Sequence, residues 1–195
     1  SPHPSIAALI LAGGKSSRMG SDKALVDYQG KPMLLSVYQV AAACTEQVYI
    51  LTPWSDRYQS ILPPDCQYLV ESQPGKGPVN GLYQGLEQIS ADWILLLACD
   101  LPLLDVEILQ SWINKLPQIP ASTLALVPQR SQIWEPMCGF YRKEVKTELD
   151  TFLKMGKRSF QDLLSGINVE ALNVDEKTGL MLFNCNSPGD LEKGS

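Results

Sequence analysis

Short apolar runs alternate with amphipathic stretches along most of this chain. The apolar runs predict strands at residues 6–11, 48–52, 67–70, 93–98, 123–127, 137–141, 168–172 and 181–183. Apolar residues at helical spacing predict helices at residues 34–44, from Pro78 onward, and at 108–116, 143–153 and 158–164. This alternation is typical of βα units and favours a largely parallel sheet, in which residues 137–141 are a candidate antiparallel strand.

Two of these apolar runs lead into motifs that suit ligand binding. Residues 6–11 lead into Ala12-Gly13-Gly14, and residues 93–98, the strongest strand signal in the chain, lead into Cys99-Asp100. Because ligands bind at the carboxyl ends of the strands in an open parallel sheet, both motifs are expected at the same edge. Asp100 is then expected to face the glycine turn.

The glycine turn predicts a phosphate site. Gly13 and Gly14 allow backbone conformations that are closed to other residues, and successive N–H groups in such a turn form a concavity that suits phosphate. Arg18 and Lys23 add positive charge, and an Arg side chain grips phosphate oxygens with a bidentate fork. We therefore interpret residues 11–23 as a triphosphate-binding loop. The alternative is an ordinary strand-ending turn with solvated lysines.

The spacing within this loop excludes two commoner phosphate loops. A P-loop requires GxxxxGK[ST], whereas five residues separate Gly14 from Gly20 here, and Ser21 stands where Lys is required. The GxGxxG motif is absent as well. The loop therefore belongs to some other class of phosphate-binding turn.

Asp100 is the candidate metal ligand. Phosphate loops normally need a carboxylate for Mg²⁺ nearby, and one carboxylate with waters and phosphates is enough for that ion. The alternative is that Asp100 serves only as a helix cap or turn former, which is a common role of Asp after a strand. Asp105 is a separate candidate cap for the helix that follows.

A second shaped loop precedes the helix expected from Pro78. Residues 71–81 contain three glycines and two prolines, which predicts a loop of defined shape. Gly81 and Gly85 lower the helix propensity of the segment that follows. We expect them to allow close approach of this helix to the sheet or to a flat ligand; the alternative is a helix that is merely weak.

Composition narrows the functional classes. The 195 residues are expected to form one domain, and 45% hydrophobic residues are ample for its core. The net charge is −5 and no basic tract occurs, which argues against a nucleic-acid-binding face. An acidic protein that binds a polyanion must concentrate its cations locally, and Lys15, Arg18, Lys23 and Lys31 are such a concentration.

The numbers and positions of cysteine and histidine argue against disulfides and against histidine-based catalysis. The five cysteines are odd in number and form no CxxC motif, so free thiols in a reducing compartment are expected. The single histidine, His3, lies in a Pro-rich start, and residues 1–5 are expected to be disordered or foreign to the domain. Histidine-based acid–base chemistry and histidine-ligated metals are therefore not expected. No signal peptide or membrane span is visible, which favours the cytoplasm.

The end of the chain predicts a strand end followed by a short helix. Ser187 and Asp190 have the spacing of a capping box, with Pro188 at the first helical position. These roles leave Asn184 and Asn186 free to order the edge of the site.

Four ordered motifs resemble the signature of nucleotidyltransferases, and their combination is similar to the molybdenum cofactor guanylyltransferase (MobA) family. The first is LAGGKSSRMG at residues 11–20, followed by Asp22-Lys23 and Gly30-Lys31-Pro32. The others are GPVNG at 77–81, where the family has GPLAG, CDLP at 99–102, and NCNSPGDL at 184–191. The resemblance covers nearly the whole chain.

The resemblance implies a Rossmann-like α/β fold: a mostly parallel sheet with helices on both faces and a small antiparallel portion. It implies transfer of GMP from GTP to the terminal phosphate of molybdopterin-bound molybdenum, with Mg²⁺ as cofactor. Proteins that insert the cofactor or act as chaperones of target enzymes are candidate partners.

The resemblance also implies roles for individual residues. Leu11, Ala12, Gly13 and Gly14 contact the nucleotide, Lys23 binds phosphate, and Asp100 holds Mg²⁺; Lys23, Arg18 and Asp100 are the candidate catalytic residues. Glu71 falls where the family commonly has a guanine-contacting Asp, and its longer side chain moves the carboxylate. Pro136-Met137 falls in a segment associated with the acceptor.

Two other functions remain open on the sequence. The nearer is a cytidylyltransferase that acts on molybdopterin or on a small sugar or polyol phosphate. The other belongs to a different class: a non-catalytic adaptor that binds nucleotide but releases no pyrophosphate.

Overall fold

A mixed sheet forms the centre of the molecule. The structure is a computed structural model that describes residues 3–13 and 22–185. The sheet runs in the order β10-β7-β9-β6-β1-β4-β5, and β8 pairs with β7. Its strands are β1 (Ile6–Leu11), β4 (Gln47–Thr52), β5 (Gln67–Val70), β6 (Trp93–Ala98), β7 (Ala125–Arg130), β8 (Ile133–Trp134), β9 (Cys138–Arg142) and β10 (Val169–Leu172). Neighbouring strands are parallel except where β9 pairs with β6 and β7 and where β8 pairs with β7.

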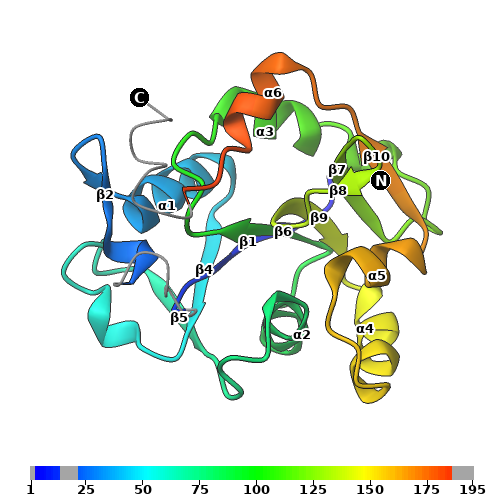
Figure 1. Ribbon diagram of the computed structural model, residues 1–195, viewed down its shortest axis with the longest axis horizontal. Helices are drawn as coiled ribbons and strands as arrows, with labels where there is room; N and C mark the ends of the chain where they lie inside the picture. The colour runs from blue at the N-terminus through cyan, green and yellow to red at the C-terminus, as the bar shows by residue number, and fades with distance from the viewer. Residues whose placement is uncertain (1–2, 14–21, 186–195) are drawn as a thin grey trace.

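Helices cover both faces of this sheet, as Figure 1 shows. On one face lie α1 (Met33–Cys44), α3 (Val106–Ile113) and α6 (Glu176–Met181). On the other lie α2 (Pro78–Gln88), α4 (Val145–Lys154) and α5 (Phe160–Ser165). Short 3₁₀ helices are η1 (Lys23–Leu25), η2 (Ser55–Arg57) and η3 (Leu116–Gln118). The expectation of a mostly parallel sheet with helices on both faces and a small antiparallel portion is confirmed.

Strand β1 shows how the sequence pattern builds two cores. Its side chains alternate between faces, so Ala8 and Ile10 pack with α1 and α3 while Ala7 and Leu9 pack with α2 and α4. All four residues are fully buried. A strand buried on both faces must be apolar throughout, which is why the continuous run at residues 6–11 predicted this element correctly.

Helix α2 approaches β1 closely through its two glycines. A Cβ atom on Gly85 would lie 2.3 Å from Cδ2 of Leu9, and one on Gly81 would lie 2.9 Å from Cδ1 of Leu11. Both distances are below any real contact, so a larger residue requires the leucine side chain, the helix or the strand to move. The expected close approach to the sheet is confirmed, and it brings the first turn of α2 to the end of β1.

The structure differs from the sequence-based expectation in three places. Residues 181–183 are not a strand: Asp175 accepts a hydrogen bond from the Thr178 amide and caps α6, and Met181 is buried at the end of this helix. Strand β7 begins later than expected and runs to Arg130. It continues through a turn with positive φ at Ser131 and Gln132 into β8. The sheet therefore extends beyond the expected strand by residues 128–130 and by the hairpin partner β8.

Two smaller features were also not expected. Strands β2 (Asp27–Tyr28) and β3 (Lys31–Pro32) form a separate antiparallel hairpin. Ser5 contacts the residue before β6: its amide donates to the Asp92 carboxylate and its hydroxyl accepts from the Asp92 amide, each at 2.9 Å. The expectation that residues 1–5 are disordered or foreign to the domain stays a prediction. The capping box expected at Ser187 and Asp190 lies outside the described residues.

Candidate active site

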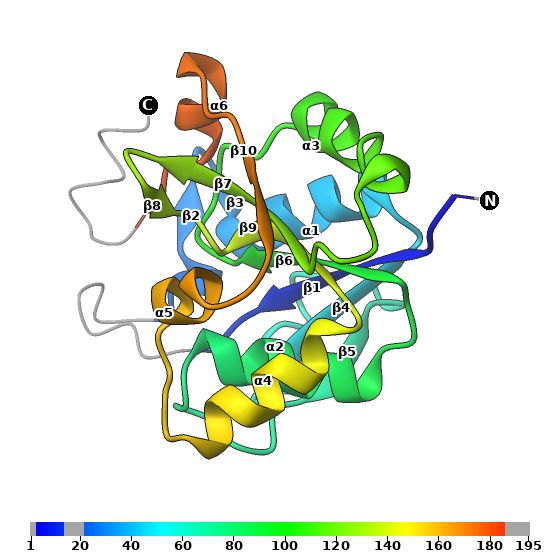
Figure 2. The ribbon, with the colours of Figure 1, turned by 90° about the vertical axis from the view of Figure 1, so that its right-hand side faces the viewer.

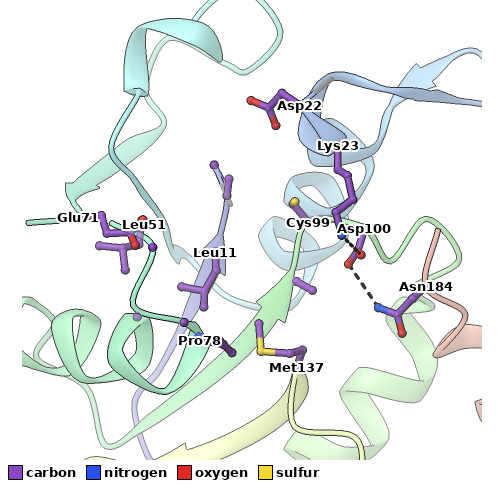
Figure 3. A pocket seen from close by; sticks show the side chains of 16 residues that line it. Leu11, Asp22, Lys23, Leu51, Glu71, Pro78, Cys99, Asp100, Met137 and Asn184 are labelled. Atoms are coloured by element: carbon purple, nitrogen blue, oxygen red, sulfur yellow. Dashed lines mark hydrogen bonds and ion pairs between the residues drawn. The ribbon is translucent and has the colours of Figure 1, made fainter. Parts of the chain in front are cut away.

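The ends of β1 and β6 meet at one edge of the sheet, above a cavity of about 490 Å³. The two strands are parallel neighbours in which Leu11 pairs with Ala98, so the residues that follow each strand emerge side by side. The cavity is lined by Leu11, Ala12, Gly13, Asp22, Lys23, Leu51, Glu71, Pro78, Cys99, Asp100, Met137 and Asn184, among others (Figure 3). The two sequence motifs therefore face each other, as expected.

Gly13 turns the chain at the tip of β1. Its φ is +97°, and a Cβ atom there would lie 3.0 Å from Thr52, Pro53 and Trp54 side-chain atoms. Only glycine meets both constraints without strain. The Ala12 amide is already engaged, since it donates to the Leu51 carbonyl at 3.1 Å. Among these two residues, Gly13 is thus the better placed to offer its backbone N–H to a ligand.

Lys23 and Asp100 form an ion pair at one wall of the cavity. Lys23 Nζ lies 3.2 Å from Asp100 Oδ2, and Asn184 Nδ2 donates to Asp100 Oδ1 at 3.3 Å (Figure 3). The Asp100 side chain is 8% exposed and that of Lys23 is 26% exposed. The pair joins a residue after β1 to a residue after β6.

Asp100 does not serve as the cap of the next helix. Asp105 has that role, and its Oδ1 accepts from the Glu107 and Ile108 amides at 2.8 and 3.2 Å. The Asp100 carbonyl accepts from the Cys185 amide at 3.0 Å, which ties the segment after α6 to the site. The Asp100 carboxylate is thus directed at the cavity, with a basic and an amide side chain beside it.

Asp22 anchors the short helix that carries Lys23. Its Oδ1 accepts from the Ala24 amide at 3.0 Å, and its Oδ2 accepts from the Tyr58 hydroxyl at 2.6 Å and from Arg57 Nη1 at 3.3 Å. The Arg57 guanidinium in turn lies 3.9 Å from the centroid of the Trp54 ring. Residues 52–58 therefore contact both Gly13 and Asp22, the residues on either side of positions 14–21.

Replacing Tyr58 with Phe should loosen this anchor. Burial and the Asp22 carboxylate raise the pKa of Tyr58, so its hydroxyl stays protonated and donates. Loss of a hydrogen bond to a charged acceptor should lower the free energy of unfolding by about 1.5–3 kcal/mol. Chemical denaturation measures this change, and the amide resonances of Lys23 and Ala24 should shift with it.

Tyr28→Phe is the matched control for this substitution. The Tyr28 hydroxyl is buried and has no hydrogen-bond partner in residues 3–13 and 22–185. Its removal should leave stability unchanged or raise it slightly. Equal stability losses in the two variants would show that the bond to Asp22 contributes nothing.

Two further titratable groups line the cavity. Burial raises the pKa of Glu71, and Figure 3 places this residue on the other side of the cavity from Lys23 and Asp100. Desolvation, together with the Asp100 carboxylate, raises the pKa of the Cys99 thiol to about 12. Cys99 is therefore a neutral thiol near pH 7 and not a thiolate nucleophile.

The donor set around Asp100 suits a metal shared with phosphates. In the described part of the chain no group of three or more His, Cys, Asp or Glu side chains could enclose an ion. Mg²⁺ is commonly held by one or two carboxylates together with waters and substrate phosphates, and a single buried carboxylate at the cavity wall fits that pattern.

The structure brings together Leu11, Ala12, Gly13, Lys23, Glu71 and Asp100 from the sequence-based hypothesis. Gly14 and Arg18 lie outside the described residues, as does Asn186. Sequence reasoning missed Leu51, Cys99 and the anchoring residues Arg57 and Tyr58. Leu51 and Tyr58 carry no motif that could have revealed them, whereas Cys99 stands next to Asp100 within a motif that the sequence did show.

Comparison with known proteins gives concordant matches. A family model described as "MobA-like NTP transferase domain" matches residues 8–170. A protein of Trichormus variabilis named "Probable molybdenum cofactor guanylyltransferase" is 47% identical over 95% of this chain and 88% of its own length. The "Molybdenum cofactor guanylyltransferase" of Pseudomonas putida is 33% identical over 97% of both chains.

A solved structure shares the fold. The molybdopterin-guanine dinucleotide biosynthesis protein A of Archaeoglobus fulgidus superposes with a TM-score of 0.81 at 22% identity, covering 96% of each chain. Within the described residues, no helix is long and apolar enough to cross a membrane.

Proposed function

Because the chain belongs to the MobA-like NTP transferase family, we propose that it transfers GMP from GTP to the terminal phosphate of molybdopterin-bound molybdenum. Pyrophosphate is the second product. The observation that carries this proposal is the Lys23–Asp100 pair beside the Gly13 turn, which places a cation and a carboxylate at one wall of the cavity. Relatives that bear the guanylyltransferase name at up to 47% identity support the choice of substrates.

The bond changes are those of nucleotidyl transfer. A terminal phosphate oxygen of the acceptor attacks the α-phosphorus of GTP, a new P–O bond forms, and the bond to the β-phosphate oxygen breaks. The nucleophile is already ionised, so no general base is needed. This agrees with a cavity whose Cys99 is protonated and whose lining contains no histidine among the described residues. Catalysis then rests on positioning and charge neutralisation.

The ion pair has a direct role in this proposal. Lys23 and Asp100 neutralise each other in the structure. A bound metal–triphosphate would offer its cation to the Asp100 carboxylate and its anionic oxygens to the Lys23 ammonium group. Two ion pairs with the ligand would then replace the one pair between the side chains. Asp100 would hold Mg²⁺, and Asn184 would keep the carboxylate oriented through Oδ1. When bound, Mg²⁺ supplies polarisation of the phosphate and compensation of its charge.

The remaining residues divide between the two ends of the nucleotide. Gly13 would offer its backbone to the phosphates together with Leu11 and Ala12, although the Ala12 amide is occupied by Leu51. Glu71, on the far side of the cavity from Lys23, would face the base. For Gly14 and Arg18, the resemblance to the family supports the proposal that they contact the phosphates. A cytoplasmic location and hand-over to cofactor-inserting chaperones belong to the same proposal, with the family resemblance as their support.

Release of pyrophosphate tests the proposal. Purified protein with molybdenum-bound molybdopterin should release pyrophosphate from GTP in the presence of Mg²⁺, and should release little from ATP, CTP or UTP. Omission of Mg²⁺ should abolish the release. A preference for CTP would make the protein a cytidylyltransferase, and nucleotide binding without pyrophosphate release would make it an adaptor. Either result would overturn the proposal.

A further inference from the structure

A second hollow lies on the α2 side of the sheet, away from the active-site cavity. We call it the α2–α4 groove and define it by Gln73, Lys76, Asn80, Leu153, Lys157 and Arg158, which line a volume of about 240 Å³ together with Gly156. None of these residues lines the active-site cavity. Helices α2 and α4 run side by side here, and the Tyr83 hydroxyl of α2 donates to Asp150 of α4 at 3.1 Å (Figure 2).

Asn80, which lines this groove and also an adjoining hollow that contains Glu87 and Asp150, has an unpaired polar group. The residue is only 8% exposed, and its Nδ2 atom is buried without a hydrogen-bond partner in the described part of the chain. A buried donor left without a partner is costly, so an acceptor from outside the chain is the expected complement. Asn80 stands where the resembling family has Ala in its GPLAG segment, so the general fold of the family does not require this amide.

The groove is strongly cationic in a chain whose net charge is −5. Three of its seven lining residues, Lys76, Lys157 and Arg158, carry positive charge, and none carries negative charge. Asn80 also lies in the first turn of α2, where backbone N–H groups and the helix dipole favour an anion. Charge, dipole and the unpaired amide all point to the same class of ligand.

The cations on the α4 side are held by an ordered turn. Gly156 has φ +76°, its amide donates to the Leu153 carbonyl at 2.9 Å, and the Lys157 amide donates to the Phe152 carbonyl at 3.3 Å. This pair of bonds is a helix C-terminal motif that fixes the direction of the chain. Cations are also common beside a helix C-terminus, where they compensate the dipole. Compensation of the α4 dipole accounts for Lys157, but it does not account for the buried, unpaired side-chain amide of Asn80 across the groove.

We propose that the α2–α4 groove binds a small phosphate-class oxyanion, separately from the active-site cavity. One oxygen accepts from Asn80 Nδ2, and Lys76, Lys157 and Arg158 neutralise its charge. Inorganic phosphate and pyrophosphate share this chemistry. The groove and the cavity lie on opposite sides of one loop, because Lys76 lines the groove while Gly75 and Gly77 line the cavity.

Two-dimensional ¹H–¹⁵N NMR of the full chain tests this site. Sodium phosphate and sodium pyrophosphate are titrated separately, against sodium chloride at matched ionic strength. The side-chain amide of Asn80 and the backbone amides of Gly156 and Lys157 should shift and saturate with either phosphate species and not with chloride. Saturation with only one of the two species would support the proposal and identify that species as the ligand. The Gly13 amide reports any binding in the active-site cavity, so the two sites are distinguished in one experiment.

Asn80→Ala is the decisive variant, because Ala is a good helix former and the fold should persist. It should weaken the apparent affinity reported by Gly156 and Lys157 by about tenfold or more, as expected for loss of a hydrogen bond to a charged acceptor. Arg158→Gln should also weaken binding, whereas Lys177→Gln, an exposed cation of α6 on the other face of the sheet, should not. Unchanged affinity in Asn80→Ala, or equal shifts with chloride, would overturn the proposal.

Discussion

Asp100→Asn is expected to lose turnover by about 10²-fold or more, since charge stabilisation at the reacting phosphate is among the largest catalytic terms. The substitution keeps the shape of the side chain and its contact with Asn184, but it removes the charge that faces Lys23. The fold should therefore persist while Mg²⁺-dependent release of pyrophosphate falls. Steady-state assays over a range of Mg²⁺ concentrations, with circular dichroism as the check on folding, measure both.

Asp105→Asn is the matched control for this experiment. Asp105 follows the same strand only five residues later, yet its carboxylate caps α3 and does not line the cavity. Its loss should cost up to about 1 kcal/mol of stability and leave turnover close to that of the unmodified protein. Normal Mg²⁺ dependence in Asp100→Asn would remove Asp100 from the proposed metal site, because the charged carboxylate would then be dispensable.

Gly85→Val is expected to cause the largest loss of stability of any substitution considered. A Cβ atom alone would lie 2.3 Å from Leu9 Cδ2, and Leu9 is fully buried in the middle of β1. Overpacking of a tight core typically costs about 1–3 kcal/mol, and the extra methyl groups of Val place this change at the upper end. Chemical denaturation should therefore show a free energy of unfolding lower by about 3 kcal/mol.

Two further variants separate overpacking from helix propensity. Gly179→Ala places a methyl group in another helix, where the nearest atom is 3.4 Å away, and should stabilise by about 0.5–1 kcal/mol. Combining Gly85→Val with Leu9→Ala should restore part of the loss, since the truncated side chain makes room. If Gly85→Val were as stable as the unmodified protein, α2 would not be held against β1 as closely as described.

The sequence predicted the parts of the fold whose burial leaves a strong pattern. Residues 6–11, 67–70 and 93–98 were assigned as strands with the bounds that the structure shows. Each is a short run of mainly apolar residues bounded by turn residues. Buried strands are typically of this length, whereas helices are longer. The same pattern placed the glycine turn and Asp100 at one edge, and the ion pair between Lys23 and Asp100 is consistent with that expectation.

The missed features depend on contacts between distant segments. Residues 181–183 look like a short strand because three apolar residues cannot distinguish a helix end from a strand, and the cap at Asp175 decides the matter. Tyr58 reaches Asp22 across 36 positions of sequence, and nothing near Tyr58 indicates such a contact. The unpaired amide of Asn80 likewise follows only from packing, although its departure from the family motif was visible.

The reversed strand β9 has a consequence for how such a site can diversify. Because β9 runs against β6, the Met137 carbonyl accepts from the Ala98 amide at 3.0 Å, and the residue just before β9 reaches the edge where β1 and β6 end. This edge of the cavity is therefore built by the residues that follow β1 and β6 and by the residue that precedes β9. Substitutions in the turn before β9 are expected to change contacts with a second substrate without changing the residues that follow β1 and β6.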